Sequence, residues 1–227
     1  TPAQIAWDFN RGAPVGHWRF DECQGTTAHD VSGNENHGTI NIGGSGTQTS
    51  AGTCTSGNSA HAWYNGREGR INSAMSFDGT DDYLNLGINS YDFGIRRHGT
   101  FSAWVKPESA VNHDLISDWQ SNIGITLRVR SDYRAEFYVY PNNYRATSDS
   151  VVFNSGSWSH YVGVMDYDEI RLYVNGKQVA QTSLGGEVGN SGATLKVGRR
   201  GDLDFGPTNG LIDDVRIYNY ALTPLQI

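Results

Sequence analysis

The chain of 227 residues has no long hydrophobic run, few prolines and little positive charge. No segment approaches the ~20 consecutive apolar residues of a membrane-spanning helix, so we expect no membrane insertion. The 17 Lys and Arg against 24 Asp and Glu give a formal net charge of −7. This balance argues against a nucleic-acid partner, because phosphates are bound by basic faces. With 37% hydrophobic residues and 18% charged residues, the composition is that of a folded chain and excludes intrinsic disorder.

The sequence also lacks sustained helical periodicity. Instead, apolar and polar residues alternate with period two, as at 123–130, where Ile125, Leu127 and Val129 would share one face of an extended chain. The Asn175-Gly176 pair is typical of a two-residue hairpin, because both turn positions need positive φ. We therefore expect strands at 16–20, 74–77, 83–86, 100–106, 123–130, 135–140, 157–165, 169–175, 177–182, 195–198 and 210–218, with a helical turn only at 221–227.

Roughly a dozen short strands with regular turns predict an all-β fold, an antiparallel β-sandwich or barrel. No Pro- or Gly-rich linker separates two cores, and no repeat recurs at a fixed period. We predict a single sandwich domain over residues 1–227. It would have an N-terminal lead-in at 1–14 and a long, low-complexity surface loop at 41–60.

Only two cysteines are present, Cys23 and Cys54, and they flank a segment rich in Gly, Ser, Thr and Asn. Both lie in polar, loop-like sequence, which favours a disulfide that would stabilise an otherwise poorly ordered loop. Two buried free thiols are the alternative. A disulfide would indicate an oxidising compartment, and hence an extracellular or cell-surface location.

Several segments together resemble the laminin G-like jelly-roll domains of the concanavalin A-like lectin/glucanase superfamily. They occur in the family's order, and they are HWRFDE at 17–22, DVSGNENHG at 30–38, AMSFDG at 74–79 with DDY at 81–83, FSAWVKP at 101–107, WSH at 158–160, LYVNGK at 172–177 and GLIDDVRIYN at 210–219. The resemblance implies an antiparallel jelly roll. It also implies one module of a multidomain secreted or surface-attached protein, because such domains usually occur in that setting. It is weak for function, since one fold hosts many functions.

A calcium site is the most specific chemical prediction. Asp213 alternates with Leu211, Val215 and Ile217, which would place a carboxylate on the apolar face of a strand. A buried, unpaired carboxylate is unfavourable, and Ca²⁺ binds carboxylate and carbonyl oxygens. The resemblance implies a structural calcium that ties the first strand to the last. Its implied ligands are the carboxylate of Asp213 and a carbonyl near Gly79, and Asp21 and Asp30 could supply further charge.

Two alternatives to calcium remain open from the sequence. Asp213 could instead be hydrogen-bonded to backbone amides or paired with an arginine such as Arg19 or Arg216. Zinc is not expected, because the chain has only two cysteines and no histidine pair at ligand spacing.

The motifs of known catalytic sites are missing. Enzymes of the resembled superfamily carry a Glu-x-Asp-x-Glu strand, but no two of the seven glutamates here lie four residues apart. There is no Gly-x-Ser-x-Gly elbow, and the Asp166-Tyr167-Asp168 segment falls in an expected turn. We therefore expect no enzymatic activity. Hydrolysis by two carboxylates that the fold alone brings together remains an alternative.

The outward residues of the central strands form a candidate ligand-binding set. Aromatic rings can stack on sugar rings, and arginines can donate directed hydrogen bonds to hydroxyls or fork onto a carboxylate. The same side chains could equally serve as cross-strand partners that cover a sheet. The candidates are Trp119, Arg128, Tyr138, Tyr140, Arg171 and Tyr173.

Three functions remain open at this stage. The first is a calcium-stabilised carbohydrate-binding or adhesion module, with a glycan as partner. The second is a structural or protein-interaction module of a surface protein. The third is a glycan-active enzyme.

Overall fold

The computed structural model describes residue 5 and residues 12–152, 154–202 and 205–227. Its strands and one short helix are, in chain order, β1 (Gly16–Trp18), β2 (Thr27–Ala28), β3 (Gly38–Asn41), α2 (Ala62–Asn65), β4 (Met75–Asp78), β5 (Tyr83–Asn85), β6 (His98–Pro107), β7 (His113–Ser117), β8 (Gly124–Val129), β9 (Ala135–Tyr140), β10 (Tyr144–Thr147), β11 (Ser159–Asp166), β12 (Glu169–Val174), β13 (Lys177–Ser183), β14 (Lys196–Val197) and β15 (Asn209–Tyr218).

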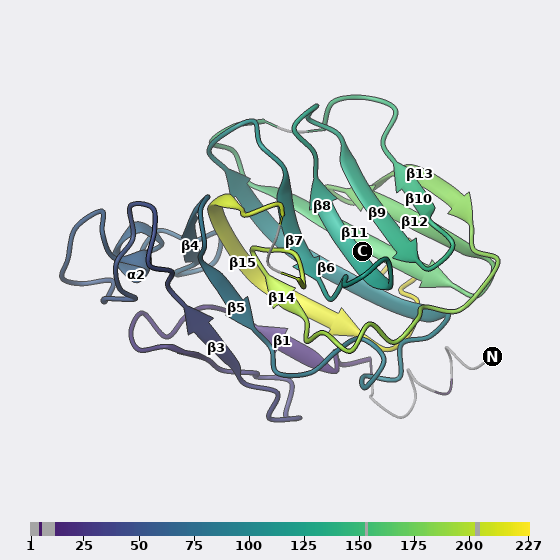
Figure 1. Ribbon diagram of the computed structural model, residues 1–227, viewed down its shortest axis with the longest axis horizontal. Helices are drawn as coiled ribbons and strands as arrows, with labels where there is room; N and C mark the ends of the chain where they lie inside the picture. The colour runs from purple at the N-terminus through teal and green to yellow at the C-terminus, as the bar shows by residue number, and fades with distance from the viewer. Residues whose placement is uncertain (1–4, 6–11, 153, 203–204) are drawn as a thin grey trace.

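Two antiparallel sheets pack face to face (Figure 1). The seven-stranded sheet has the order β1-β15-β6-β11-β12-β13, with β4 also paired to β15. The eight-stranded sheet has the order β10-β9-β8-β7-β14-β5-β3-β2. This arrangement confirms the predicted all-β jelly-roll sandwich. Strands that are far apart in the sequence are neighbours in the sheet, and the first strand, β1, pairs with the last, β15.

The hydrophobic core lies between the sheets and follows from the alternation along each strand. Phe101 of β6 and Phe137 of β9 face each other with ring centroids 5.9 Å apart. On β11, Gly163 leaves room for this contact, because a Cβ there would come within 2.6 Å of the Phe137 ring. Trp18 is fully buried in the same cluster. Burying a large side chain of this kind stabilises a fold by roughly 1.5–3 kcal/mol.

The predicted hairpin at Asn175-Gly176 joins β12 to β13, and both turn residues have positive φ, 51° and 76°. In the tail at 221–227, where a helical turn was expected, the structure has one turn, closed by the Gln226 N–H on the Thr223 carbonyl at 2.9 Å, and no helix. The tail lies against the seven-stranded sheet, where Ala221 and Ile227 pack on Val162, Val164 and Tyr173. Most of the predicted lead-in at 1–14 falls outside the described residues.

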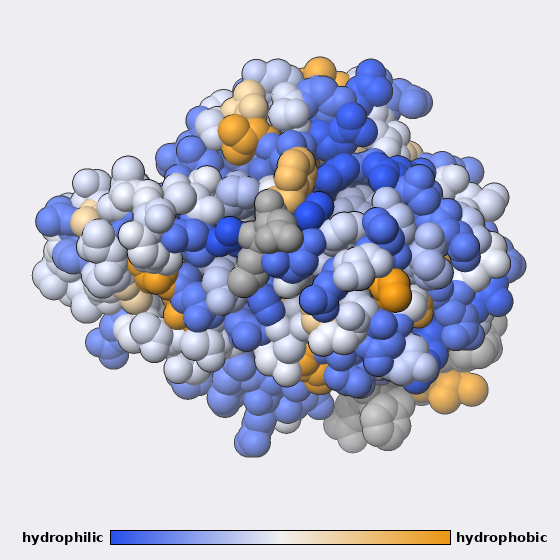
Figure 2. Space-filling view, in the orientation of Figure 1, coloured by the Kyte–Doolittle hydropathy of each residue, from blue (hydrophilic) through white to orange (hydrophobic). Residues whose placement is uncertain are grey.

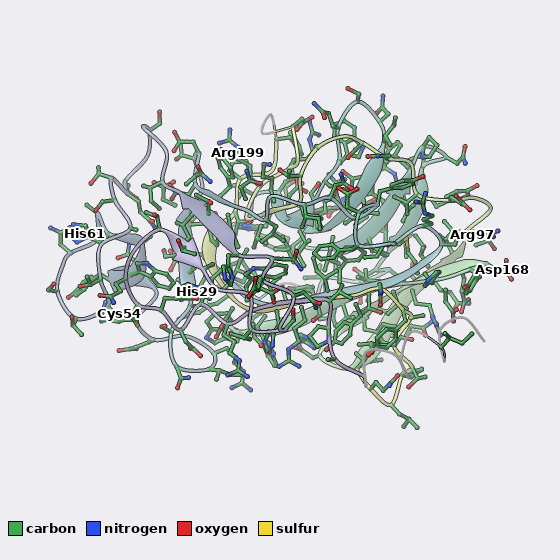
Figure 3. The ribbon with its side chains drawn as sticks, turned by 90° about the horizontal axis from the view of Figure 1, so that it is seen from below. His29, Cys54, His61, Arg97, Asp168 and Arg199 are labelled. Carbon is green, nitrogen blue, oxygen red and sulfur yellow. A yellow bond between two sulfur atoms is a disulfide. The ribbon has the colours of Figure 1, made fainter. Side chains whose placement is uncertain are left out.

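Residues 42–74 form a lobe at one end of the sandwich, and the predicted disulfide between Cys23 and Cys54 is confirmed there. In Figure 3, Cys54 and His61 lie in this lobe, while Arg97 and Asp168 lie at the opposite end. The lobe has its own anchor in Trp63 of α2, which is fully buried and donates its indole N–H to the carbonyl of Gly25 at 2.9 Å.

In the predicted loop 41–60, isolated bridges at Ser50 and Thr53 are the main regular contacts. No helix in the described ranges combines the length and apolar character needed to cross a membrane.

Candidate ligand-binding face and metal sites

The six predicted ligand-binding residues do not share one surface. Trp119 follows β7, and Arg128, Tyr138 and Tyr140 lie on β8 and β9, all in or beside the eight-stranded sheet. Arg171 and Tyr173 lie on β12 of the seven-stranded sheet. The sequence alternation gives the outward direction of each side chain, but it does not say which sheet a strand joins.

Tyr173 and Arg171 are engaged within the protein. Tyr173 is 1% exposed, because the C-terminal tail covers it. The Arg171 guanidinium pairs with Asp166 at 2.8 Å and with Glu169 at 3.4 Å. These contacts leave the eight-stranded sheet as the better candidate for a binding surface.

Strand register places polar side chains in one row across that sheet. Residues directly opposite on neighbouring strands point to the same face. Because Leu127 and Phe137 face the core, their neighbours Thr126 and Tyr138 face outward. The residues paired with these two on the other strands therefore also face outward. We call this side the outer face. The polar row runs through Asn85, Lys196, Ser117, Thr126, Tyr138 and Arg145.

An arginine–glutamate network lies beside the polar row. Glu136 is fully buried, and its Oε2 accepts the Nε of Arg128 at 2.8 Å. Its Oε1 lies 3.3 Å from Arg145 and 3.8 Å from Arg130, and it accepts the Thr147 hydroxyl at 3.2 Å. Three guanidinium groups therefore share one carboxylate. This network fixes the orientation of polar groups that a ligand would otherwise have to order.

Aromatic side chains gather at the edge of the network. The Trp119 and Tyr140 rings meet edge to face at 6.0 Å, and Tyr138 and Tyr140 meet at 5.4 Å. The Arg200 guanidinium lies 4.2 Å from the centre of the Trp119 ring and 5.1 Å from that of Phe205. Tyr138 is 3% exposed, whereas Trp119 and Tyr140 are half-buried. The accessible aromatic surface is therefore that of Trp119, Tyr140 and Phe205, with Tyr138 beneath.

The view in Figure 2 shows a predominantly hydrophilic surface with hydrophobic residues in small, separate spots. Such a surface suits a hydrated ligand better than an apolar one.

Asp114 is the most unusual group on the outer face. It is opposite Arg128 on β8 and is fully buried, and neither carboxylate oxygen has a hydrogen-bond donor among the described residues. Burial raises its pKa to about 7, against the opposing effect of Arg128 and Arg200. The backbone of Gly206 covers it, because a Cβ there would lie 2.0 Å from Oδ2. Asp114 is therefore a buried acid beneath the outer face.

Sequence reasoning missed several residues of this face. Lys196 alternates with Leu195 and Val197 in a predicted strand, so its outward position could have been read from the sequence. The sequence pattern does not single out Arg145 or Arg200, because Arg145 lies on a four-residue strand and Arg200 lies in irregular chain after β14.

The four predicted calcium ligands are not all brought together. Asp213 and Asp21 line one pocket of about 210 Å³ on the seven-stranded sheet, together with Arg19, Ile71, Asn72, Asp214 and Arg216. Asp30 instead accepts the backbone N–H of His17 in β1 and those of Ser32 and Asn36 in its own loop. Gly79 lies in the turn after β4, beside Asp78.

Asp213 departs from its predicted position on the core face. A β-bulge between Asp213 and Arg216 adds a residue, Asp214, with φ 49°. Ile212 and Val215 therefore face the core, and Asp213 faces the pocket. It is fully buried, and its Oδ2 accepts the Ile71 N–H at 2.8 Å while Oδ1 lacks a hydrogen-bond partner among the described residues.

The pocket around Asp213 also contains a closed ion-pair group. Asp214 lies 2.6 Å from His17 Nε2 and 2.9 Å from Arg216. Arg216, one of the two arginines that the sequence offered to Asp213, thus pairs with Asp214, and the other, Arg19, lines the same pocket. Burial raises the pKa of Asp213 to about 6, against the opposing effect of its backbone hydrogen bonds.

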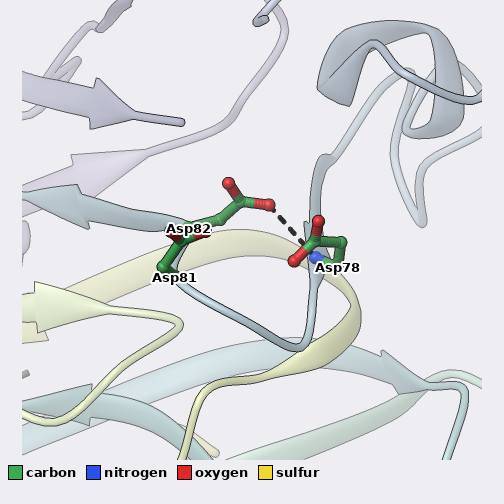
Figure 4. Close-up of side chains that lie close together, drawn as sticks. All are labelled: Asp78, Asp81 and Asp82. Atoms are coloured by element: carbon green, nitrogen blue, oxygen red, sulfur yellow. Dashed lines mark hydrogen bonds between the residues drawn. The ribbon is translucent and has the colours of Figure 1, made fainter. Parts of the chain in front are cut away.

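A second acidic group, Asp78, Asp81 and Asp82, could hold a metal ion, since their carboxylate oxygens lie within 4.8 Å of one another (Figure 4). Most of these oxygens already accept backbone N–H groups, from Gly43 and Ser45 and from the other donors Thr47, Gln48, Asp78 and Thr80. Only Asp81 Oδ1 is buried without a partner within the described part of the chain. The group therefore ties the 43–48 segment to the β4–β5 turn.

His160 is engaged in packing, and Asp168 is exposed to solvent. The ring of His160 stacks on Trp104 at 5.1 Å, and burial lowers its pKa to about 4. Asp168 is almost fully exposed at its side chain and pairs loosely with Arg97 at 3.5 Å. Neither arrangement resembles an activated nucleophile or a general base.

Comparison with known proteins identifies the relatives of this fold. The family model described as the concanavalin A-like lectin/glucanases superfamily matches residues 78–227, more than half of the chain. No curated protein sequence matches. Domain 4 of AbnA, an extracellular arabinanase from Geobacillus stearothermophilus solved with arabinotriose, is 22% identical, with a TM-score of 0.71 over 94% of this chain and 96% of that one.

Two other solved structures share the fold at lower identity. The CBM40 of a Ruminococcus gnavus sialidase, bound to α2,3-sialyllactose, is 13% identical, with a TM-score of 0.56 over 66% of this chain and 92% of its own. The binding domain of botulinum neurotoxin serotype D is 14% identical, with a TM-score of 0.63 over 97% of this chain but 51% of its own. At these identities the likeness is one of fold.

Proposed function

The chain belongs to the concanavalin A-like lectin/glucanases superfamily, and on that premise we propose that it is a non-catalytic carbohydrate-binding or adhesion module of a larger secreted or cell-surface protein. The observation that carries the proposal is the outer face of the eight-stranded sheet. There the half-buried rings of Trp119 and Tyr140 stand beside arginines held by Glu136. Aromatic rings next to fixed hydrogen-bond donors suit sugar rings and their hydroxyls.

Two further observations support this reading. Similar folds in the arabinanase domain and the CBM40 were solved with bound sugars. The confirmed disulfide supports an extracellular or cell-surface location, because such bonds persist in oxidising compartments.

The test is a glycan array followed by titration with Trp119→Ala. We expect this change to lower affinity for the bound glycan about fivefold or more, because removing a stacking aromatic ring forfeits about 1–3 kcal/mol. Tyr173→Phe is the matched control, since Tyr173 lies under the tail of the other sheet and should leave binding unchanged. Binding to proteins alone would favour an interaction module, and release of products from a polysaccharide would favour an enzyme.

We also propose that the module is stabilised by a structural Ca²⁺ in the pocket of Asp213 and Asp21. The orphaned Asp213 Oδ1 and the nearby Asp21 carboxylate fit a cation that prefers oxygen ligands. When bound, the ion would neutralise buried negative charge and connect β15 to the segment after β1. The Asp78, Asp81 and Asp82 group is the weaker candidate, because backbone donors occupy most of its oxygens.

Adding millimolar Ca²⁺ after chelation with EDTA is expected to raise the melting temperature by about 5–10 °C, since a ligand at a hundredfold excess over Kd adds about 2.7 kcal/mol. Asp213→Asn should abolish most of this shift, and exposed Asp168→Ala should not. A shift that survives Asp213→Asn but is lost in Asp81→Asn would move the ion to the second acidic group. No shift in the unmodified protein would contradict the calcium proposal.

A further inference from the structure

The polar row carries a cation near each end. Lys196 lies on β14 and Arg145 on β10, four strand spacings apart across β7, β8 and β9. Neighbouring strands lie about 4.8 Å apart, so the two cationic strands are separated by roughly 19 Å. Between them lie the buried hydroxyls of Ser117 and Thr126 and the largely buried ring of Tyr138, with no carboxylate in the row itself.

Ion pairing on the outer face leaves Lys196 without a carboxylate among the described residues and gives Arg145 only a shared one. Arg128 pairs with Glu136 at 2.6 Å, Arg130 with Asp132 at 3.1 Å, and Arg200 with Asp202 at 2.7 Å. Asp132 and Asp202 thus each have a near guanidinium, and Glu136 is shared by Arg128, Arg130 and Arg145. The remaining acid is Asp114, which faces Arg128 and Arg200 and lies under Gly206, away from the solvent.

Lys196 is the more buried of the two cations and has no anionic partner among the described residues. It is 7% exposed, and its Nζ contacts the Asn85 Oδ1 at 3.3 Å, the Thr194 carbonyl at 3.4 Å and the Thr194 hydroxyl. In the described ranges no carboxylate lies within ion-pair distance of it, and burial alone lowers the pKa of its ammonium. A buried ammonium with only neutral partners is unfavourable, and an anionic ligand group would offset that cost.

Arg145 is the more accessible cation. Its side chain is 37% exposed, and it shares Glu136 with Arg128 at a longer distance of 3.3 Å. One terminal nitrogen donates to the Tyr140 hydroxyl at 2.9 Å, and the guanidinium lies 5.2 Å from the centre of the Tyr138 ring. This guanidinium therefore stands beside the aromatic surface on which a sugar would stack, and it can still meet a second anion.

From this charge arrangement we propose that the ligand of the outer face is an acidic glycan whose carboxylate groups are recognised by Lys196 and Arg145. The inference rests on the proposed carbohydrate-binding function and narrows it to a ligand class. The surplus of positive charge is local, since the whole chain carries −7. Complementary charge at one face of an otherwise acidic protein selects an anionic ligand and speeds its association.

The test uses three soluble acidic ligands: oligogalacturonates, hyaluronan oligosaccharides and sialyllactose. The affinity for each is compared with that for its methyl ester by calorimetric titration at low and high salt. Esterification removes the charge and leaves the sugar stereochemistry unchanged. We expect the affinity for at least one acid to be about tenfold or more above that for its ester. A hydrogen bond to a charged group contributes enough free energy for a difference of this size. Raising the salt concentration should lower the affinity for the acid and leave the affinity for its ester unchanged.

Variants assign the effect to residues. Lys196→Met and Arg145→Gln should each lose about tenfold in affinity for the acid and little for the ester. Lys177→Gln, on exposed β13 of the other sheet, should lose neither. Because Arg145 is exposed, its variant remains informative if Lys196→Met folds poorly.

The outcomes separate the two proposals. Equal binding of acids and esters, or binding of neutral glycans alone, would overturn the acidic-ligand inference and leave carbohydrate binding intact. No binding of any acidic or neutral glycan would overturn both.

Discussion

Replacing Asp114 with asparagine is expected to raise the free energy of unfolding at pH 8 by about 2–4 kcal/mol. The carboxylate is fully buried without a hydrogen-bond donor among the described residues, and burial raises its pKa to about 7. The unfolded chain releases this proton near pH 4, whereas the native protein releases it near pH 7. The native state therefore binds more protons between these values, so this group's contribution makes stability fall as pH rises from about 4 to about 7.

The pH dependence of the difference provides the control. Asparagine has nearly the same shape and does not titrate, so the gain of Asp114→Asn over the unmodified protein should be largest at pH 8 and small near pH 4. Urea denaturation of both proteins at pH 4.5, 6 and 8 measures this difference. A variant as stable as or less stable than the parent at pH 8 would contradict the account.

Asp118 supplies a matched comparison, because it is equally buried but well supplied with hydrogen bonds. Its carboxylate accepts the Ile125 N–H at 2.8 Å and both the N–H and the hydroxyl of Ser90. In asparagine the side-chain NH₂ group replaces one of these accepting oxygens and would face a donor, so at least one hydrogen bond is lost. Asp118→Asn should therefore lower stability at pH 8, opposite in sign to Asp114→Asn.

Removing the disulfide is the second large effect. The bond closes a loop with a sequence separation of 31 between Cys23 and Cys54. In the chain-entropy account, opening a loop of this length lowers the free energy of unfolding by about 3–4 kcal/mol. We expect that loss in the Cys23→Ser/Cys54→Ser double variant, measured by urea denaturation of both proteins without reductant.

Reductant gives the internal control for this prediction. Reducing the unmodified protein should lower its stability to that of the double-serine variant, and the variant itself should not respond. Since Trp63 anchors the lobe independently through Gly25, the double variant should keep its fold. A double variant as stable as the oxidised parent would show that the bond adds no stability.

The sandwich itself could be predicted because most of its strands alternate. The 123–130 and 135–140 segments place Leu127 and Phe137 inward, and the structure pairs them as β8 and β9. The strand β7 was missed because all five of its residues are buried, so it has no alternating pattern. The strand β10 was missed because it has only four residues and follows a turn.

The candidate sites were less predictable, for two physical reasons. Alternation gives the direction of Arg128 and Arg171 on their strands, yet only the long-range pairing of strands decides that they belong to opposite sheets. A β-bulge cannot be seen in a period-two pattern, so Asp213 was expected to face the core. The Asp213-Asp214 pair carried the available signal, since aspartate tolerates the positive φ that Asp214 adopts.

The lysine of the outer face illustrates a different limit. Lys196 lies in a strand that the sequence predicts. Its significance, however, is that no carboxylate in the described structure lies within ion-pair distance of it. Only the three-dimensional arrangement shows that the acids of the face already belong to Arg128, Arg130 and Arg200.

The central claim, that the outer face of the eight-stranded sheet binds carbohydrate, is tested most directly by following the six tryptophan indole signals in a ¹H–¹⁵N NMR titration with the best glycan from the array. The account predicts that the Trp119 signal, assigned with Trp119→Phe, shifts with saturation, while those of fully buried Trp18 and Trp63 stay in place. A saturating shift at Trp104, on the seven-stranded sheet, with Trp119 unchanged would contradict it.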